Sequence, residues 1–278
     1  MKRNTFFNIK VITVFSFIWL FTGCTNLDEV VLDEVLGDNA SNPAGALAAA
    51  YDRLGDGTFV DHGGVFSLQE YTTDEAILPT RGSDWGDGGK WRDMHEFTWK
   101  SDNAIVGSNW NLLTNGITRS LTAIQSVEES SIPEKKLFLA EAKGLLAYYL
   151  YTTLDLYGQA PYRDPMNPNA PLQILKADTQ IDKLITDVEA LIPDLADLGE
   201  QQTHNGRFTK QAAYGFLSVM YLNRAVFKDR FNTSSNFNFN EPAVAGSTGT
   251  DMDRVIYYTS LLINSGKFSL ESDYFKNF

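Results

Sequence analysis

The stretch that most constrains the fold is GLLAYYLYTTLDLY, residues 144–157. It lies in a predicted helix over about 132–157, and it is apolar on nearly every side. A helix without a polar face is buried on most of its surface, because water would otherwise cover its apolar side chains. The pattern therefore predicts a helix at the centre of the domain.

Further helices are predicted on both sides of this segment, because apolar residues recur there at i, i+3, i+4 and i+7. Asp178 is expected to cap one of them, and Thr209 stands near the start of another. Ser131 and Glu134 have the spacing of a capping box, and Asn42 before Pro43 is a plausible N-cap. The predicted ranges are 43–54, 101–127, 178–195, 207–227 and 251–265.

Very little of the chain alternates in polarity as a half-buried strand does. Segment 159–172 has four prolines between positions 161 and 171, which predicts a rigid irregular connection. Residues 228–250 form a polar loop rich in Asn, Ser and Gly. The expected fold class is mainly α, with long irregular surface loops.

Small residues recur inside the long apolar helices, where they allow close packing. Paired antiparallel helices with Ala, Leu and Tyr at this spacing are typical of TPR-like arrays, in which neighbouring units share one core. The sequence shows no self-match at 34 residues, so any repeat is degenerate. The small residues in question are Ala140, Gly144, Ala147, Ala212, Ala213 and Gly215.

The N-terminus has the pattern of a secretory signal over residues 1–23. Basic residues precede Val11–Phe21, an apolar run too short to span a bilayer permanently. Cys24, the only cysteine, follows Thr22 and Gly23, and this resembles a bacterial lipobox with Phe21 in place of the usual Leu. We expect acylation of Cys24, an acidic lipidated linker over 24–40, and a helical domain over 41–278.

Removal of this signal would delete three positive charges, so that the formal net charge would fall from −12 to −15. Such an acidic surface repels nucleic acid and anionic headgroups. The phosphate-binding pattern GxxxxGK[ST] is also missing from the sequence. Nucleic-acid binding is therefore set aside.

Segment 79–91, PTRGSDWGDGGKW, places two tryptophans in a run with four glycines. This composition argues against regular structure, since glycine gives the backbone freedom that folding must remove. Either the segment folds back under the domain, or Trp85 and Trp91 face something other than protein.

Motifs for catalysis and metal binding are absent from the sequence. His62, His95 and His204 fit no HExxH pattern, and GxSxG is missing. Residues 84–88 do not match a calcium loop. We expect no metal and no cofactor, whereas a carboxylate pair for glycoside hydrolysis remains an open alternative.

Five ordered blocks of the sequence resemble the SusD/RagB family of surface lipoproteins. Each block is weakly specific, but together they cover essentially the whole chain in the order and spacing of the family. They are GCTNLDE (23–29), NPAGALAAAYDRL (42–54), YTTDEAILPTRGSDWGDGGKWRDMHEFTW (71–99), EAKGLLAYYLYTTLDLYGQAPYRDP (141–165) and GRFTKQAAYGFLSVMYLNRAVF (206–227).

The resemblance implies a non-catalytic protein that binds oligosaccharide and passes it to a SusC-like TonB-dependent transporter. It would be anchored through Cys24 to the outer membrane of a Gram-negative bacterium, facing the exterior, and Asp28 and Glu29 resemble the acidic signals for that location. Family members are about twice as long, so we expect a truncated chain. The alternatives are a lipid-anchored glycosidase or esterase, and a TPR-type peptide-binding scaffold.

The resemblance also assigns site residues. In the family, aromatic rings stack on sugar faces while polar groups bind the hydroxyls. Trp85 and Trp91 are the expected stacking platforms, and Arg81 and Asp84 are the expected hydrogen-bonding partners. Asn109 and Trp110 are outside candidates. Without a ligand role, Trp99 and Trp110 are expected in the core.

Overall fold

The computed structural model describes residues 42–55, 59–167, 169–201, 206–230, 237–244 and 246–277. The predicted signal, Cys24 and the acidic linker lie outside these residues. The long helices are α2 (Pro43–Gly55), α5 (Ala104–Glu128), α6 (Lys135–Tyr157), α7 (Ala177–Leu191), α8 (Lys210–Lys228) and α9 (Asp251–Asn264). The short elements are α3 (Val65–Glu70), α4 (Lys90–Glu96), β1 (Gln159–Tyr162), β2 (Gln173–Lys176), and the 3₁₀ turns Asp87–Gly89, Ile192–Asp194 and Tyr274–Asn277.

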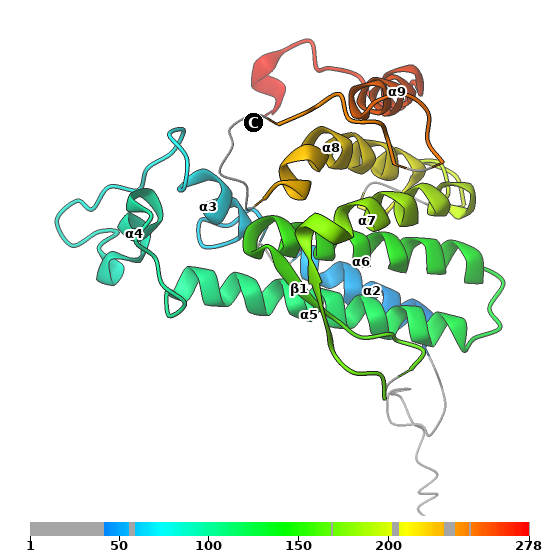
Figure 1. Cartoon of the computed structure of the whole chain (residues 1–278), viewed down its shortest axis with the longest axis horizontal. Helices are drawn as coiled ribbons and strands as arrows, with labels where there is room; N and C mark the ends of the chain where they lie inside the picture. Colours follow the sequence, from blue (N-terminus) through cyan, green and yellow to red (C-terminus); the bar gives the residue numbers. More distant parts are fainter. Residues whose placement is uncertain are drawn as a thin grey trace, which may run out of the picture. The chain divides into compact units, whose positions relative to one another are not determined.

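Helices α2 and α5–α9, here called the helical body, confirm the predicted TPR-like arrangement. Successive helices from α5 to α9 pack side by side in alternating directions (Figure 1), and α2 packs on α5 and α6. Helix α6 contacts α2, α5, α7 and α8, and 13 of its 23 residues are buried. The predicted central helix is therefore confirmed.

Two glycines leave room for aromatic rings inside the body. A β-carbon on Gly144 of α6 would lie 2.4 Å from the ring of Phe208, and one on Gly116 of α5 would lie 2.4 Å from Tyr149. Such distances are far below van der Waals contact. The lack of a side chain at these two glycines therefore leaves the space that the neighbouring aromatic ring occupies.

Buried charges also hold the body together. Arg224 of α8 is 4% exposed, and its guanidinium donates to Asp182 of α7 at 2.6 Å and to Asp251 of α9 at 2.9 Å. Burial raises the pKa of Asp251, and the Arg224 charge opposes that shift. Fully buried Glu141 accepts from Tyr51 Oη at 2.6 Å and from Arg207. These contacts link α2 and α6 to the start of α8, and α8 to α7 and α9.

Two of the expected helix starts are confirmed. The Asn42 side chain accepts from Gly45 N–H at 2.8 Å, and Thr209 caps α8 by accepting from Ala212 N–H at 3.1 Å. The structure also contains a capping box at the start of α9, formed by Thr250 and Asp253, which lies at the end of the loop expected to be irregular.

Two other expected caps are wrong. Helix α6 begins at Lys135 with no side-chain cap, because a backbone turn from Lys135 N–H to Ile132 O precedes it. Asp178 lies inside the first turn of α7, because strand β2 leads directly into Ala177. At both helix starts a backbone N–H donates to a backbone carbonyl, Lys135 to Ile132 and Ala177 to Gly158, and no side chain caps the helix.

Segment 159–172 was expected to be irregular throughout, but its first residues pair with a later strand. Strand β1 runs antiparallel to β2, with Pro161 opposite Ile174. Proline fits here because a two-stranded sheet has only edge strands. No helix within the described residues has the length and apolar character needed to cross a bilayer.

The second departure from the prediction lies between α2 and α5. Residues 59–103, here called the site segment, contain α3, the turn Asp87–Gly89 and α4. Figure 1 shows α3 and α4 at the amino end of α5, to one side of the stacked helices. The prediction that 79–91 is wholly irregular is wrong from Asp87 onwards.

Candidate functional site

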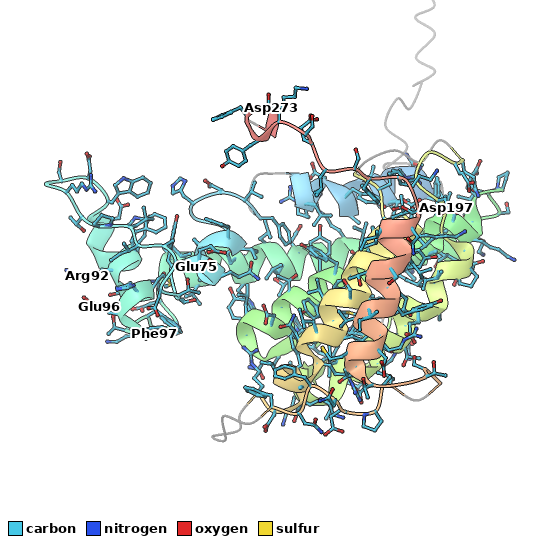
Figure 2. The ribbon with its side chains drawn as sticks, turned by 90° about the horizontal axis from the view of Figure 1, so that it is seen from above. Glu75, Arg92, Glu96, Phe97, Asp197 and Asp273 are labelled. Carbon is cyan, nitrogen blue, oxygen red and sulfur yellow. The ribbon has the colours of Figure 1, made fainter. Side chains whose placement is uncertain are left out.

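The site segment has a small hydrophobic core of its own. Tyr71, Trp91, Met94 and Ile105 are buried together, separately from the core of the helical body. They come from the end of α3, from α4 and from the first turn of α5. The first turn of α5 therefore packs into the site segment, and Val65 of α3 is in turn buried in the core of the body. Figures 1 and 2 show the ribbon of the site segment at one end of the helical body.

Two asparagines, the N-cap Asn103 and Asn109 of α5, form hydrogen bonds between α5 and the site segment. Asn103 caps α5 by accepting from Ile105 N–H at 3.0 Å, and its Nδ2 donates to Lys90 O at 3.3 Å. Asn109 is fully buried, and its Nδ2 donates to Gly63 O at 3.0 Å. Asn109 therefore cannot face a surface ligand in this structure, and its candidacy as a binding residue is wrong.

Trp91 lies within α4 and not on a loop. It is 3% exposed, and its Nε1 donates to Asp87 Oδ2 at 2.6 Å. Lys90 Nζ lies 4.6 Å from the centre of the indole ring. The expectation that Trp91 offers a stacking face to a ligand is corrected, because protein covers the ring on nearly all sides.

Trp85 is held differently. The residue is 40% exposed, and its backbone has a positive φ of 56°. Its ring meets Trp91 edge to face, with centroids 5.5 Å apart, and it meets His62 in the same way at 5.2 Å. Buried Trp91 thus supports an indole that still reaches solvent.

Arg81 and Asp84 lie at the neck of a tight turn next to Trp85. Arg81 N–H donates to Asp84 O at 3.1 Å, and Asp84 N–H donates to Arg81 O at 3.0 Å. Gly82 permits the turn with a φ of 63°, a conformation that favours glycine. Both side chains are exposed. The turn therefore places a guanidinium, a carboxylate and an indole on neighbouring residues.

Two residues that pack around the tryptophans, His62 and Tyr71, were not predicted from the sequence. His62 Nδ1 lies 2.6 Å from Asp61 Oδ1, and the His62 ring contacts both tryptophans. Burial, and then the nearby Asp61 charge, raise the pKa of Tyr71, whose ring packs on Trp91 at 6.0 Å. No spacing rule links these positions, since only the fold brings them together.

The two remaining tryptophans of the described chain also differ from expectation. Trp99 is 39% exposed, so its assignment to the core is wrong. Trp110 is half-buried and packs against Tyr157 with ring centroids 5.0 Å apart. Trp110 of α5 therefore packs on the last residue of α6, and no ring contact joins it to Trp85 in the described residues. Within the described ranges, no three His, Cys, Asp or Glu side chains gather as metal ligands would.

Solved structures with a similar fold include two surface glycan-binding proteins and a laminarin binding SusD-like protein. A surface glycan-binding protein A from Bacteroides fluxus is 19% identical, with a TM-score of 0.63, over 84% of this chain and 46% of its own. A surface glycan-binding protein A from Bacteroides uniformis is 20% identical, with a TM-score of 0.62, over 84% of this chain and 48% of its own. A laminarin binding SusD-like protein is 19% identical, with a TM-score of 0.54, over 76% and 46%.

At these identities the likeness concerns the fold, and the chain spans less than half the length of each of these proteins. No curated protein matches the sequence. A family model described as "Starch-binding associating with outer membrane" matches residues 54–222. Because this match covers more than half of the chain, the protein belongs to the SusD-like family.

Proposed function

We propose that the protein is a non-catalytic surface lipoprotein that binds oligosaccharide and delivers it to a SusC-like TonB-dependent transporter in the outer membrane. Cys24 carries the lipid anchor, and residues 24–40 form the spacer between the membrane and the helical domain. The family description names both starch binding and the outer membrane. It therefore supports the proposed saccharide binding and the proposed location.

One observation carries the binding half. Trp85 keeps an exposed indole although its positive φ is a conformation in which an L-residue costs roughly 1–2 kcal/mol. Strained residues that the surrounding structure holds in place are concentrated at functional sites. Here the residue with the strained backbone carries an exposed aromatic side chain and directly follows the turn that contains exposed Arg81 and Asp84.

The chemistry of this group suits a sugar. A pyranose presents C–H groups on one face, which an indole can cover, and hydroxyls at its edge. Arg81 can donate to these hydroxyls and Asp84 can accept from them, each through charge-assisted hydrogen bonds. Because one ring buries little apolar area, we expect dissociation constants in the micromolar to millimolar range at a single site.

The experiment that tests binding is native electrophoresis in gels containing soluble starch, laminarin or other glucans. The wild-type protein should be retarded by at least one polysaccharide and should release no reducing ends from it. Trp85→Ala should run as in a gel without polysaccharide, whereas Ile77→Ala, which removes another exposed side chain of the site segment, should be retarded like the wild type. Product release would favour the glycosidase alternative, and retention by Trp85→Ala would overturn the site.

A separate experiment tests the anchor and the transporter. Cys24→Ser should appear in the soluble fraction and should fail to incorporate labelled palmitate, while its retention in polysaccharide gels stays unchanged. The wild-type protein should co-purify from detergent-solubilised outer membranes with a TonB-dependent barrel. Membrane retention of Cys24→Ser would contradict lipidation at that residue.

A peptide-binding scaffold is kept as a second candidate because of one apolar groove. A cavity of about 770 Å³ lies between the start of α8, the end of α9 and the segment that follows it. Its apolar walls include Leu198, Ala212, Leu262, Phe268 and Leu270. Binding of apolar peptides with no retention in any glycan gel would favour this second candidate.

A further inference from the structure

A second pair of exposed aromatic side chains lies just beyond α4. Phe97 is 66% exposed and Trp99 is 39% exposed. Their ring centroids are 5.6 Å apart, with the planes inclined by 48°. Neither residue belongs to the set Arg81, Asp84 and Trp85 or to the small hydrophobic core of the site segment.

The backbone at Phe97 is strained in the same sense as at Trp85. Phe97 ends α4 with φ 54° and ψ 36°, and Thr98 N–H donates to Asp93 O at 3.0 Å. This pattern of hydrogen bonds at a helix end usually places glycine in the left-handed position. A phenylalanine in the left-handed conformation costs free energy that glycine would not cost. Because such strained residues are concentrated at functional sites, the exposed ring is a candidate for ligand contact.

Charged residues of α4 directly precede the two rings in the chain. Arg92 and Glu96 are one helical turn apart in α4, with Nε and Oε2 3.8 Å apart, and both side chains are more than half exposed. Figure 2 labels Arg92, Glu96 and Phe97 along the same side of α4. The combination of ring faces, a guanidinium and a carboxylate repeats the chemistry of Trp85, Arg81 and Asp84.

We propose that Phe97 and Trp99, with Arg92 and Glu96, form a second saccharide-binding surface for the same polysaccharide chain that Trp85 binds. This inference rests on the proposed function. A protein partner is a poorer fit, because a specific interface buries about 800 Å² on each side and two rings flanked by charges are a small part of that area. A polysaccharide needs only short contacts repeated along its length.

The physical consequence is a dependence on chain length. A polymer that reaches both surfaces makes its second contact at a high effective concentration, so its apparent affinity exceeds that of either surface alone. A tetrasaccharide held at Trp85 gains nothing from the second surface. Loss of Phe97 and Trp99 should therefore weaken the binding of polymer and leave the binding of a tetrasaccharide at Trp85 unchanged.

The test compares Phe97→Gly/Trp99→Ala, Trp85→Ala and the wild type. Glycine suits the φ of residue 97, so helical circular dichroism and the melting temperature should be retained, and Ile263→Ala on α9 controls for the loss of an exposed apolar side chain. The ligands are starch and laminarin, and tetrasaccharides of each. Binding is measured by gel retardation for the polymers and by calorimetry for the tetrasaccharides.

We expect the double variant to bind the retained polymer about tenfold more weakly, while its tetrasaccharide affinity stays within about twofold of the wild type. Trp85→Ala should lose the binding of both ligands. Unchanged polymer binding by the double variant would overturn the second surface and leave the Trp85 site intact. If the wild type binds no polymer and no tetrasaccharide, the proposed function fails and the second surface fails with it.

Discussion

The helical body and the site segment differ in how much of their apolar surface is buried. The body buries long helices around one core, with charged side chains such as Arg224 and Glu141 fully paired inside it. The site segment buries only a few side chains, among them Tyr71, Trp91 and Met94, and leaves large aromatic rings at its surface. Of the four non-glycine residues with positive φ in the described chain, three lie in the site segment: Trp85, Asp87 and Phe97.

This difference assigns separate tasks to the two regions. A densely packed body can hold a small segment in a geometry that the segment alone would not keep, because Ile105 in the first turn of α5 is buried with Tyr71, Trp91 and Met94 of the segment. Binding residues on loops fixed to a rigid scaffold are a common arrangement in proteins. Changes in the body should therefore alter stability, whereas changes at the exposed rings should alter binding.

The largest effect on stability is expected from Arg224→Ala. This substitution leaves buried Asp251 without its cation, and removal of one partner from a buried ion pair typically costs about 3–5 kcal/mol. Urea unfolding followed by circular dichroism measures the loss. Lys183→Ala, which breaks the exposed pair with Asp187, is the control and should cost about 0.5 kcal/mol or less. Equal losses in the two variants would contradict the role given to the buried pair.

A smaller effect is expected where helices pack around rings. Gly144→Ala adds a methyl group 2.4 Å from Phe208, and overpacking of a core typically costs about 1–3 kcal/mol. Gly215→Ala in α8 is a matched control, because its nearest neighbour would be Leu262 at 3.7 Å, an ordinary contact. Thermal unfolding should show a lower melting temperature for Gly144→Ala alone. A similar loss in Gly215→Ala would indicate that close packing at Gly144 is unimportant.

The smallest effect concerns the strain in the site segment. Phe97→Gly and Phe97→Ala both remove the ring, but only glycine adopts a φ of 54° without strain. The glycine variant should be the more stable of the two by about 1 kcal/mol. Chemical denaturation of both variants measures the difference. Greater stability of Phe97→Ala would show that the left-handed conformation at this position costs nothing.

The sequence predicted the helical body well because its signals are local. Apolar spacing located every long helix of the described chain, and Asn42 and Thr209 act as the expected caps. The pairing of β1 with β2 was missed, because Pro161 and its neighbouring prolines argue against a strand unless the strand lies at an edge. Helix α4 was missed because glycines precede it directly.

The candidate site was predicted only in part. Trp85, Arg81 and Asp84 are exposed on neighbouring residues, whereas Trp91 is buried. Which of two tryptophans six residues apart faces solvent depends on contacts with His62 and Tyr71, and no local pattern contains that information. The exposure of Trp99 was missed for the same reason.

We propose that the exposed indole of Trp85, supported by the buried indole of Trp91, binds saccharide without contributing to the stability of the body. Calorimetric titration of an oligosaccharide into the wild type and Trp85→Ala tests it most directly, with the melting temperature of both proteins measured in parallel. We expect Trp85→Ala to weaken the affinity by about tenfold or more, the equivalent of a lost aromatic contact, with little change in melting temperature. Equal affinity of the two proteins would contradict it.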